Sequence, residues 1–165
     1  MHTADSCRSL ARLFREVVDG VTEAGGGFML NTGDVGLLRS LDALSAGEAS
    51  QSANGGASIA AHAQHLRYGL LLMNEWAAHG GNPFANAKWD EAWTIASVTD
   101  AQWTEVKAGL RAEATQWMAV LKTPRDVSEV EYSGLVSSIA HVAYHFGAIR
   151  QISRTARGPS EGSFS

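Results

Sequence analysis

Proline is the residue that most limits which structures this chain can form, because it is almost absent. Only three prolines, Pro83, Pro124 and Pro159, occur in the 165 residues. Proline lacks a backbone N–H and its ring clashes with the preceding turn, so it interrupts helices. All three lie where a helical pattern of apolar residues ends, and the stretches between them keep that pattern. The chain is therefore predicted to be all-α.

Four long helices are expected from the apolar periodicity and from residues that can cap or end a helix. They are placed at residues 5–24, 58–78, 99–122 and 132–156. Ser58 and Thr99 (or Asp100) are the expected N-caps, and the run from Gly25 to Gly27 is expected to end the first helix. Four helices of about 20 residues favour a four-helix bundle, whose connectivity the loop lengths leave open. One domain is expected over residues 1–165, with residues 158–165 as a flexible tail.

The charge balance argues against two classes of partner. The chain has 13 Lys and Arg against 17 Asp and Glu, which gives a formal net charge of −4. Nucleic acid and anionic membrane both require a clustered basic surface, so neither is expected as a partner. Charged residues make up 18% of the chain, below the usual ~25%, which favours a surface partly covered by a second subunit and hence a homodimer.

The cellular compartment is predicted from cysteine content and from the lack of targeting segments. The single cysteine, Cys7, allows no disulfide within the chain, which favours a reducing environment. No apolar run approaches the ~18 residues that span a bilayer, and the first residues lack the basic and apolar parts of a signal peptide. A cytoplasmic protein is therefore expected.

Histidine is the residue type that indicates chemistry in this chain. His141 and His145 lie four residues apart on the expected last helix, about 6 Å apart along its axis and on one face. The residues that continue this strip are uncharged, so the two imidazoles are expected to face the bundle interior. On the second helix, His62 and His65 flank the apolar face. Histidines from two helices are therefore directed toward the same core.

Two interpretations of these histidines are open. Burying several neutral imidazoles costs free energy unless each ring nitrogen has a partner. A divalent cation can satisfy them together, and three nitrogen ligands with a vacant fourth position are typical of catalytic zinc sites. In the alternative interpretation, His62 and His65 are core or capping residues, while His141 and His145 bond to backbone or water.

Two histidine segments carry a family resemblance: Ser58-Ile-Ala-Ala-His-Ala-Gln-His-Leu-Arg-Tyr68 and Ala140-His-Val-Ala-Tyr-His-Phe-Gly-Ala-Ile-Arg-Gln151. On the two expected helices, they resemble the DinB superfamily, which consists of DinB/YfiT-like four-helix bundles with a three-histidine metal site. The resemblance extends from about Leu37 to Gln151. It implies that the metal ligands are His65, His141 and His145, and that His62 hydrogen-bonds beside the site or receives substrate. A nitrogen of His65 must then lie within about 5 Å of nitrogens on the other two, because first-row metals bind nitrogen at about 2 Å.

The resemblance also implies an activity. The family includes thiol-dependent S-transferases and a thiol-dependent isomerase, in which the metal presents a low-molecular-weight thiolate to an electrophile. A metal-dependent thiol S-transferase acting on a small electrophile is therefore expected, with zinc or nickel as the cation. The alternatives are a metal-dependent hydrolase and a non-catalytic stress protein that binds a metal or a small molecule. No acidic residue lies between His141 and His145, which argues against a protease of the His-Glu-x-x-His type.

Several other residues are weaker candidates. Arg67 and Arg150 are able to hold a carboxylate or phosphate of a ligand, but solvated charges and surface ion pairs are commoner. Tyr144 is expected to pack against a neighbouring helix, Cys7 to be an ordinary helix residue, and Asn31–Asp34 to form a turn. Four tryptophans either line a pocket or anchor the core and loops, and anchoring is favoured. They are Trp89, Trp93, Trp103 and Trp117.

Overall fold

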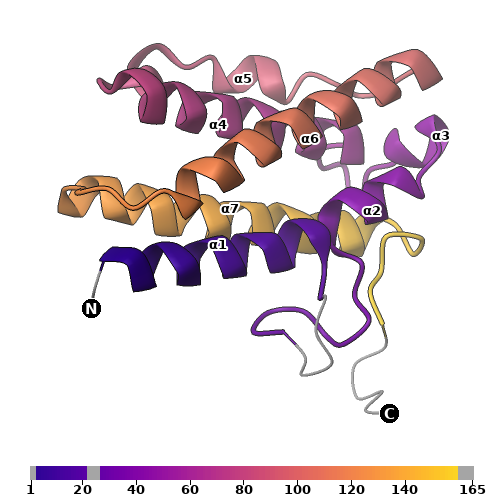
Figure 1. Ribbon diagram of the computed structural model, residues 1–165. Helices are drawn as coiled ribbons and strands as arrows, with labels where there is room; N and C mark the ends of the chain where they lie inside the picture. Colours follow the sequence, from indigo (N-terminus) through magenta and orange to yellow (C-terminus); the bar gives the residue numbers. More distant parts are fainter. Residues whose placement is uncertain (1–2, 22–26, 160–165) are drawn as a thin grey trace.

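Helices account for all the regular structure that the computed structural model describes, which covers residues 3–21 and 27–159 (Figure 1). Within these ranges no strand is present, so the all-α prediction is confirmed. The long helices are α1 (Thr3–Asp19), α4 (Ile59–His79), α6 (Asp100–Lys122) and α7 (Glu129–Ile152). The short elements are α2 (Gly36–Asp42), α3 (Ala46–Ala49), the 3-10 helix η1 (Pro83–Asn86) and α5 (Trp89–Ala92).

Side-chain caps define the starts of three long helices. The Ser58 hydroxyl accepts a hydrogen bond from the backbone N–H of Ala61, and Thr99 forms a capping box with Gln102, so both predicted N-caps are confirmed. The start predicted for the last helix, residue 132, is wrong by one turn. Ser128 caps α7 in a capping box with Glu131, so the helix begins at residue 129. The same Ser-x-x-Glu spacing is visible in the sequence.

The first helix ends earlier than predicted because a glycine meets another segment of the chain. α1 ends at Asp19, and Gly20 has a φ of +93°, a conformation that favours glycine. A Cβ on Gly20 would lie 2.3 Å from the carbonyl oxygen of Asp34, so a side chain is excluded there. Gly25, at the predicted helix end, lies outside the described residues. α7 likewise ends at Ile152 and not at residue 156, because Ser153 is extended.

Two of the long helices, α1 and α4, each pack against the other two. α4 packs against α6 and α7, and α1 packs against the same two helices (Figure 1). The side chains between them are apolar, and the largest of the fully buried ones include Phe14, Leu66, Leu110, Trp117 and Phe146. Between the first two long helices, the chain also forms α2, which packs on α1 and α6 and buries Leu37 and Leu41.

This packing determines which side chains meet. The contact between α4 and α7 places the histidine segments of the two helices next to each other. The connection from α4 to α6 carries η1 and α5, and both pack against α4. Across the described ranges, none of the helices has the length and apolar character that a bilayer crossing requires. The tail predicted at 158–165 lies outside the described residues from residue 160 onward.

Candidate metal centre

Three histidines converge between α4 and α7 through the same ring atom. The Nε2 atom of His141 lies 3.0 Å from Nε2 of His65 and 2.9 Å from Nε2 of His145. One nitrogen of each residue lies within 4.8 Å of the others, so the proximity that a shared ion requires is present. His65 and His145 are buried, and His141 is half-buried. These are the three residues that the sequence resemblance singled out.

The close contacts among these nitrogens cannot all be well-formed hydrogen bonds. An imidazole nitrogen has one position in the ring plane, which holds either a proton or a lone pair. The Nε2 atom of His141 has two close nitrogen neighbours, and one position can satisfy only one of them. A cation that accepts a lone pair from each ring satisfies all three nitrogens together. The donor set therefore fits a divalent transition metal.

His62 is placed beside this group and not within it. Its Nδ1 atom lies 3.0 Å from Nδ1 of His145, on the side of that ring opposite the Nε2 atom that meets His141. One of the two Nδ1 atoms must donate and the other must accept. If the Nε2 lone pair of His145 serves a cation, its Nδ1–H donates to His62. His62 therefore has the geometry of a residue that orients a ligand.

Burial keeps the histidines in the neutral form that has a free lone pair. The pKa of His145 is lowered to about 3, first by burial and then by the neighbouring histidines. Burial, followed by the charges of His141 and His62, lowers the pKa of His65 to about 4. Burial also lowers the pKa of His62 and of His141. At neutral pH all four rings are therefore uncharged.

Two tryptophans from the connection between α4 and α6 lie over the histidines. Trp93 stacks on His65, with ring centroids 4.2 Å apart and planes at 25°, and it meets His62 edge-on at 5.3 Å. Trp89 lies 5.4 Å from His65. Anchoring of the core and loops was the favoured role for the tryptophans, and Trp103 and Trp117 are indeed buried in the core. The contacts of Trp89 and Trp93 with histidine were not predicted, because a helix as short as α5 has no periodicity that reveals the direction of its side chains.

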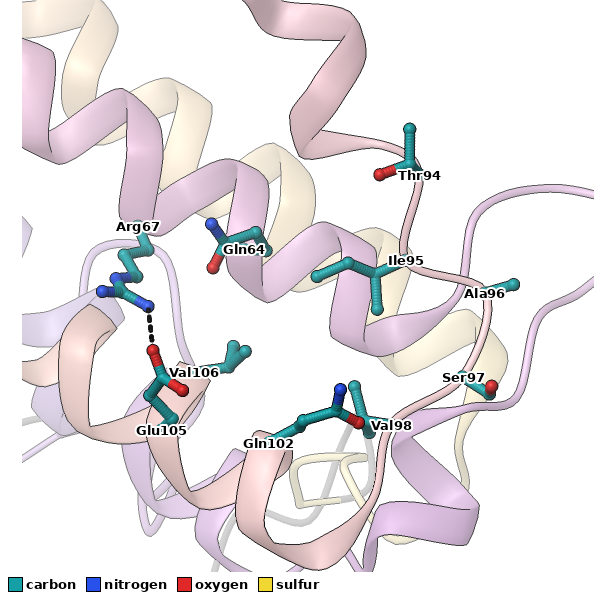
Figure 2. Close-up of a pocket in the computed structure, with 10 residues that line it drawn as sticks. All are labelled: Gln64, Arg67, Thr94, Ile95, Ala96, Ser97, Val98, Gln102, Glu105 and Val106. Atoms are coloured by element: carbon teal, nitrogen blue, oxygen red, sulfur yellow. Dashed lines mark ion pairs between the residues drawn. The ribbon is translucent and has the colours of Figure 1, made fainter.

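The two candidate arginines are engaged in ion pairs. Arg150 donates from Nη2 to both carboxylate oxygens of Asp34, at 2.7 Å each, and Asp34 is almost fully buried. This pair ties the end of α7 to the turn after α1. Nη1 of Arg67 lies 3.9 Å from Oε1 of Glu105 in α6. The pair lies at one end of a hollow of about 510 Å³, and residues 94–98 line the other end (Figure 2). None of the residues that line this hollow is a histidine, so it is separate from the candidate metal centre.

Two further expectations have different outcomes. Tyr144 was predicted to pack against a neighbouring helix, and this is wrong: its side chain is 72% exposed. The face of α7 on which it lies is not covered by another described element, and its ring meets only the edge of His145, at 5.0 Å. Cys7 is buried within α1, and its sulfur lies 3.8 Å from the carbonyl oxygen of Thr123, as expected for an ordinary helix residue.

Comparison of the chain with protein-family models, with curated proteins and with solved structures found no match. The chemistry of the histidine group is therefore the basis for assigning a function.

Proposed function

We propose that the protein is a DinB-like metal-binding enzyme in which His65, His141 and His145 hold one divalent cation. The observation that carries the proposal is the convergence of three Nε2 atoms from two helices, at distances that a cation explains better than protons do. Imidazole nitrogens suit zinc and nickel, which are the cations we expect. The pairwise packing of α1, α4, α6 and α7 supports a DinB-like four-helix bundle as the scaffold.

The reaction we propose is the transfer of a small thiol to a small electrophile. A cation bound by three neutral ligands supplies Lewis-acid chemistry and lowers the pKa of a thiol that binds it. The thiol proton passes to solvent, the sulfur forms a bond to the electrophilic carbon, and the leaving group departs with its electron pair. The protein's part is to keep the histidines neutral, to orient them and to exclude water with Trp89 and Trp93.

Thiol transfer is favoured over hydrolysis by what surrounds the histidines. Their ring contacts and hydrogen bonds are with one another and with aromatic side chains. Among the described residues, no carboxylate forms a hydrogen bond or ion pair with them that could serve as a general base for water. A thiol needs no such base, because its pKa in solution is about 8.5, whereas the pKa of water is about 15.7. A non-catalytic role, a homodimer and a cytoplasmic location remain predictions from the sequence.

The test compares the protein loaded with zinc or nickel, the same protein treated with chelator, and the variant His141→Ala. The probe reaction is the conjugation of 2-mercaptoethanol, or of another small thiol, to 1-chloro-2,4-dinitrobenzene. Absorbance measures the formation of the product. His79→Ala is the matched control, because His79 lies exposed at the end of α4. We expect turnover in the loaded wild type and in His79→Ala, with loss in the other two samples. Turnover that survives chelation would contradict the proposal, and tight metal binding without turnover of any thiol would favour the non-catalytic alternative.

A further inference from the structure

A second hollow adjoins the histidine group on the side of His141. It has a volume of about 240 Å³ and is lined by residues of α4 and α7, together with Phe84 of η1 and Trp89 of α5. His141 forms one wall, and Leu70 and Met73 of α4 form another. The hollow therefore borders the candidate metal centre, because His141 belongs to both.

Two glycines inside helices contribute to the walls of this hollow. Gly69 lies in α4 and Gly134 in α7, where glycine is less stable than alanine. A Cβ on Gly69 would come no closer than 3.6 Å to the ring of His141, and one on Gly134 no closer than 3.9 Å to Met73. These are ordinary contacts, so the packing of the helices does not require glycine at either position. What a side chain would occupy is the space of the hollow.

Two aromatic side chains, Phe84 and Trp89, line the hollow. Phe84 is 38% exposed, which is high for so apolar a side chain, and it stacks on Trp89 with planes at 7° and ring centroids 6.4 Å apart. Trp89 also lies 5.4 Å from His65. An apolar molecule that entered past Phe84 would therefore be in contact with residues of the metal centre.

The polar groups of the hollow are few, and one of them already has partners. The Ser138 hydroxyl accepts a hydrogen bond from the indole N–H of Trp117 and donates one to the carbonyl oxygen of Leu135. A ligand there gains mainly from burial of apolar surface. A cavity of about 150 Å³ is large enough for benzene, so about 240 Å³ accommodates an aromatic ring with a short substituent.

We propose that this hollow binds the apolar part of the substrate, an aromatic or branched aliphatic group, and so places the reacting end of the molecule beside His141. Gly69 and Gly134 keep the hollow open, and they determine the size of group that it accepts. This inference rests on the proposed function, since it assigns the substrate class of the same site. The binding step itself can be measured without metal.

The first experiment uses the metal-free protein and the probe 4-fluorobenzyl alcohol, whose binding is followed by fluorine NMR. Gly134→Leu fills the hollow, and Gly147→Leu is its matched control on α7, because a Cβ on Gly147 meets nothing within 4 Å. We expect the probe to bind wild type and Gly147→Leu with similar affinity. Its affinity for Gly134→Leu should be lower by about tenfold or more. Gly134→Ala, a smaller change, is expected to have an affinity between those of wild type and Gly134→Leu. It provides the test if the leucine variant does not fold. If Gly134→Leu folds, an affinity equal to that of wild type would overturn the proposal. If it does not fold, equal affinities of wild type and Gly134→Ala would overturn it.

The second experiment separates the hollow from the metal centre. Cobalt-loaded protein is titrated with imidazole and with 4-phenylimidazole, and the visible absorption of cobalt is recorded. We expect both to bind, with 4-phenylimidazole about tenfold tighter in wild type and without that advantage in Gly134→Leu. Equal affinities would overturn the substrate-pocket proposal and leave the metal centre intact. No cobalt spectrum at all would instead contradict the proposed function, and the metal-free experiment would then decide on the hollow alone.

Discussion

The Nδ1 atom of His145 lies 3.0 Å from the Nδ1 atom of His62, while its Nε2 atom lies 2.9 Å from Nε2 of His141. The two nitrogens of one imidazole thus have different neighbours. A proton held on Nδ1 by His62 leaves the Nε2 lone pair free, which is the tautomer that a cation requires. The sequence left the role of His62 open, and we propose that it orients His145 through this contact.

Replacing His62 should weaken metal binding without removing a ligand. In His62→Ala the Nδ1–H of His145 loses its acceptor, and we expect a loss of about 10–100-fold in metal affinity, as is typical for residues that orient a ligand. Competition with a chelator of known affinity measures the change. X-ray absorption should still show three imidazole ligands. A His62→Ala protein with unchanged affinity would contradict this role.

Stability of the metal-free protein should fall as the pH falls below about 6.5. The pKa of His65 is lowered to about 4 and that of His145 to about 3, from an ordinary value of 6.5. Between pH 6.5 and 4.5 the unfolded chain therefore binds more protons at these residues than the folded chain, so acid favours unfolding. The pKa values of Glu48 and Glu131 are also lowered, but these residues reduce stability mainly at pH values below their ordinary pKa of 4.5.

Denaturant unfolding of the metal-free protein at several pH values between 7.5 and 4.5 measures this effect. The variant His65→Gln/His145→Gln is the comparison, because its side chains do not titrate in that range. We expect its unfolding free energy to depend less on pH than that of wild type. A wild type whose stability is constant from pH 7.5 to 4.5 would show that the two histidines are not buried as described.

The ion pair of Asp34 and Arg150 should contribute far more to stability than the exposed pair of Asp42 and Arg111. The carboxylate of Asp34 is 2% exposed and the side chain of Arg150 is 18% exposed, whereas the other two are 48% exposed each. Asp34→Ala leaves the cation of Arg150, which is mostly removed from solvent, without its carboxylate partner, and this costs about 3 kcal/mol. Asp42→Ala should cost at most about 1 kcal/mol. Chemical denaturation of both variants provides the comparison, and similar losses would contradict this assignment.

Substitution of glycine by alanine should change stability in opposite directions at different positions. Gly134→Ala and Gly147→Ala place a methyl group in a helix without a close contact, so each should stabilise the protein by about 0.5–1 kcal/mol. Gly20→Ala should destabilise it by more than about 1 kcal/mol, because its φ is +93° and the methyl group would collide with the backbone of Asp34. Thermal unfolding of the three variants tests this. A stable Gly20→Ala would mean that the two segments can separate.

The parts of the fold that could be predicted are those determined by local sequence. Ser58 and Thr99 cap helices through bonds to residues three positions away, so their roles are visible in the sequence. The end of α1 depends on the approach of Gly20 to Asp34, a tertiary contact that no local pattern reveals. The triple glycine further along is a more conspicuous stop, and it led to the wrong boundary.

The candidate site divides in the same way. The spacing of His141 and His145 predicts that they share a face, because both lie on one helix. Their contact with His65 depends on how α4 and α7 pack, and the resemblance rather than the spacing singled that residue out. The cover provided by Trp93, and the pairing of Arg150 with Asp34 across 116 positions, depend on loops whose path the sequence does not determine.

Metal content of freshly purified protein is the most direct test of a cation shared by the three histidines. Wild type and His79→Ala should each contain about one equivalent of zinc or nickel after loading and desalting, with nitrogen ligands at about 2.0–2.1 Å by X-ray absorption. His141→Ala should retain little metal, since its loss removes a ligand and not merely an orienting neighbour. Equal metal content in wild type and His141→Ala, or none in wild type, would contradict the shared site.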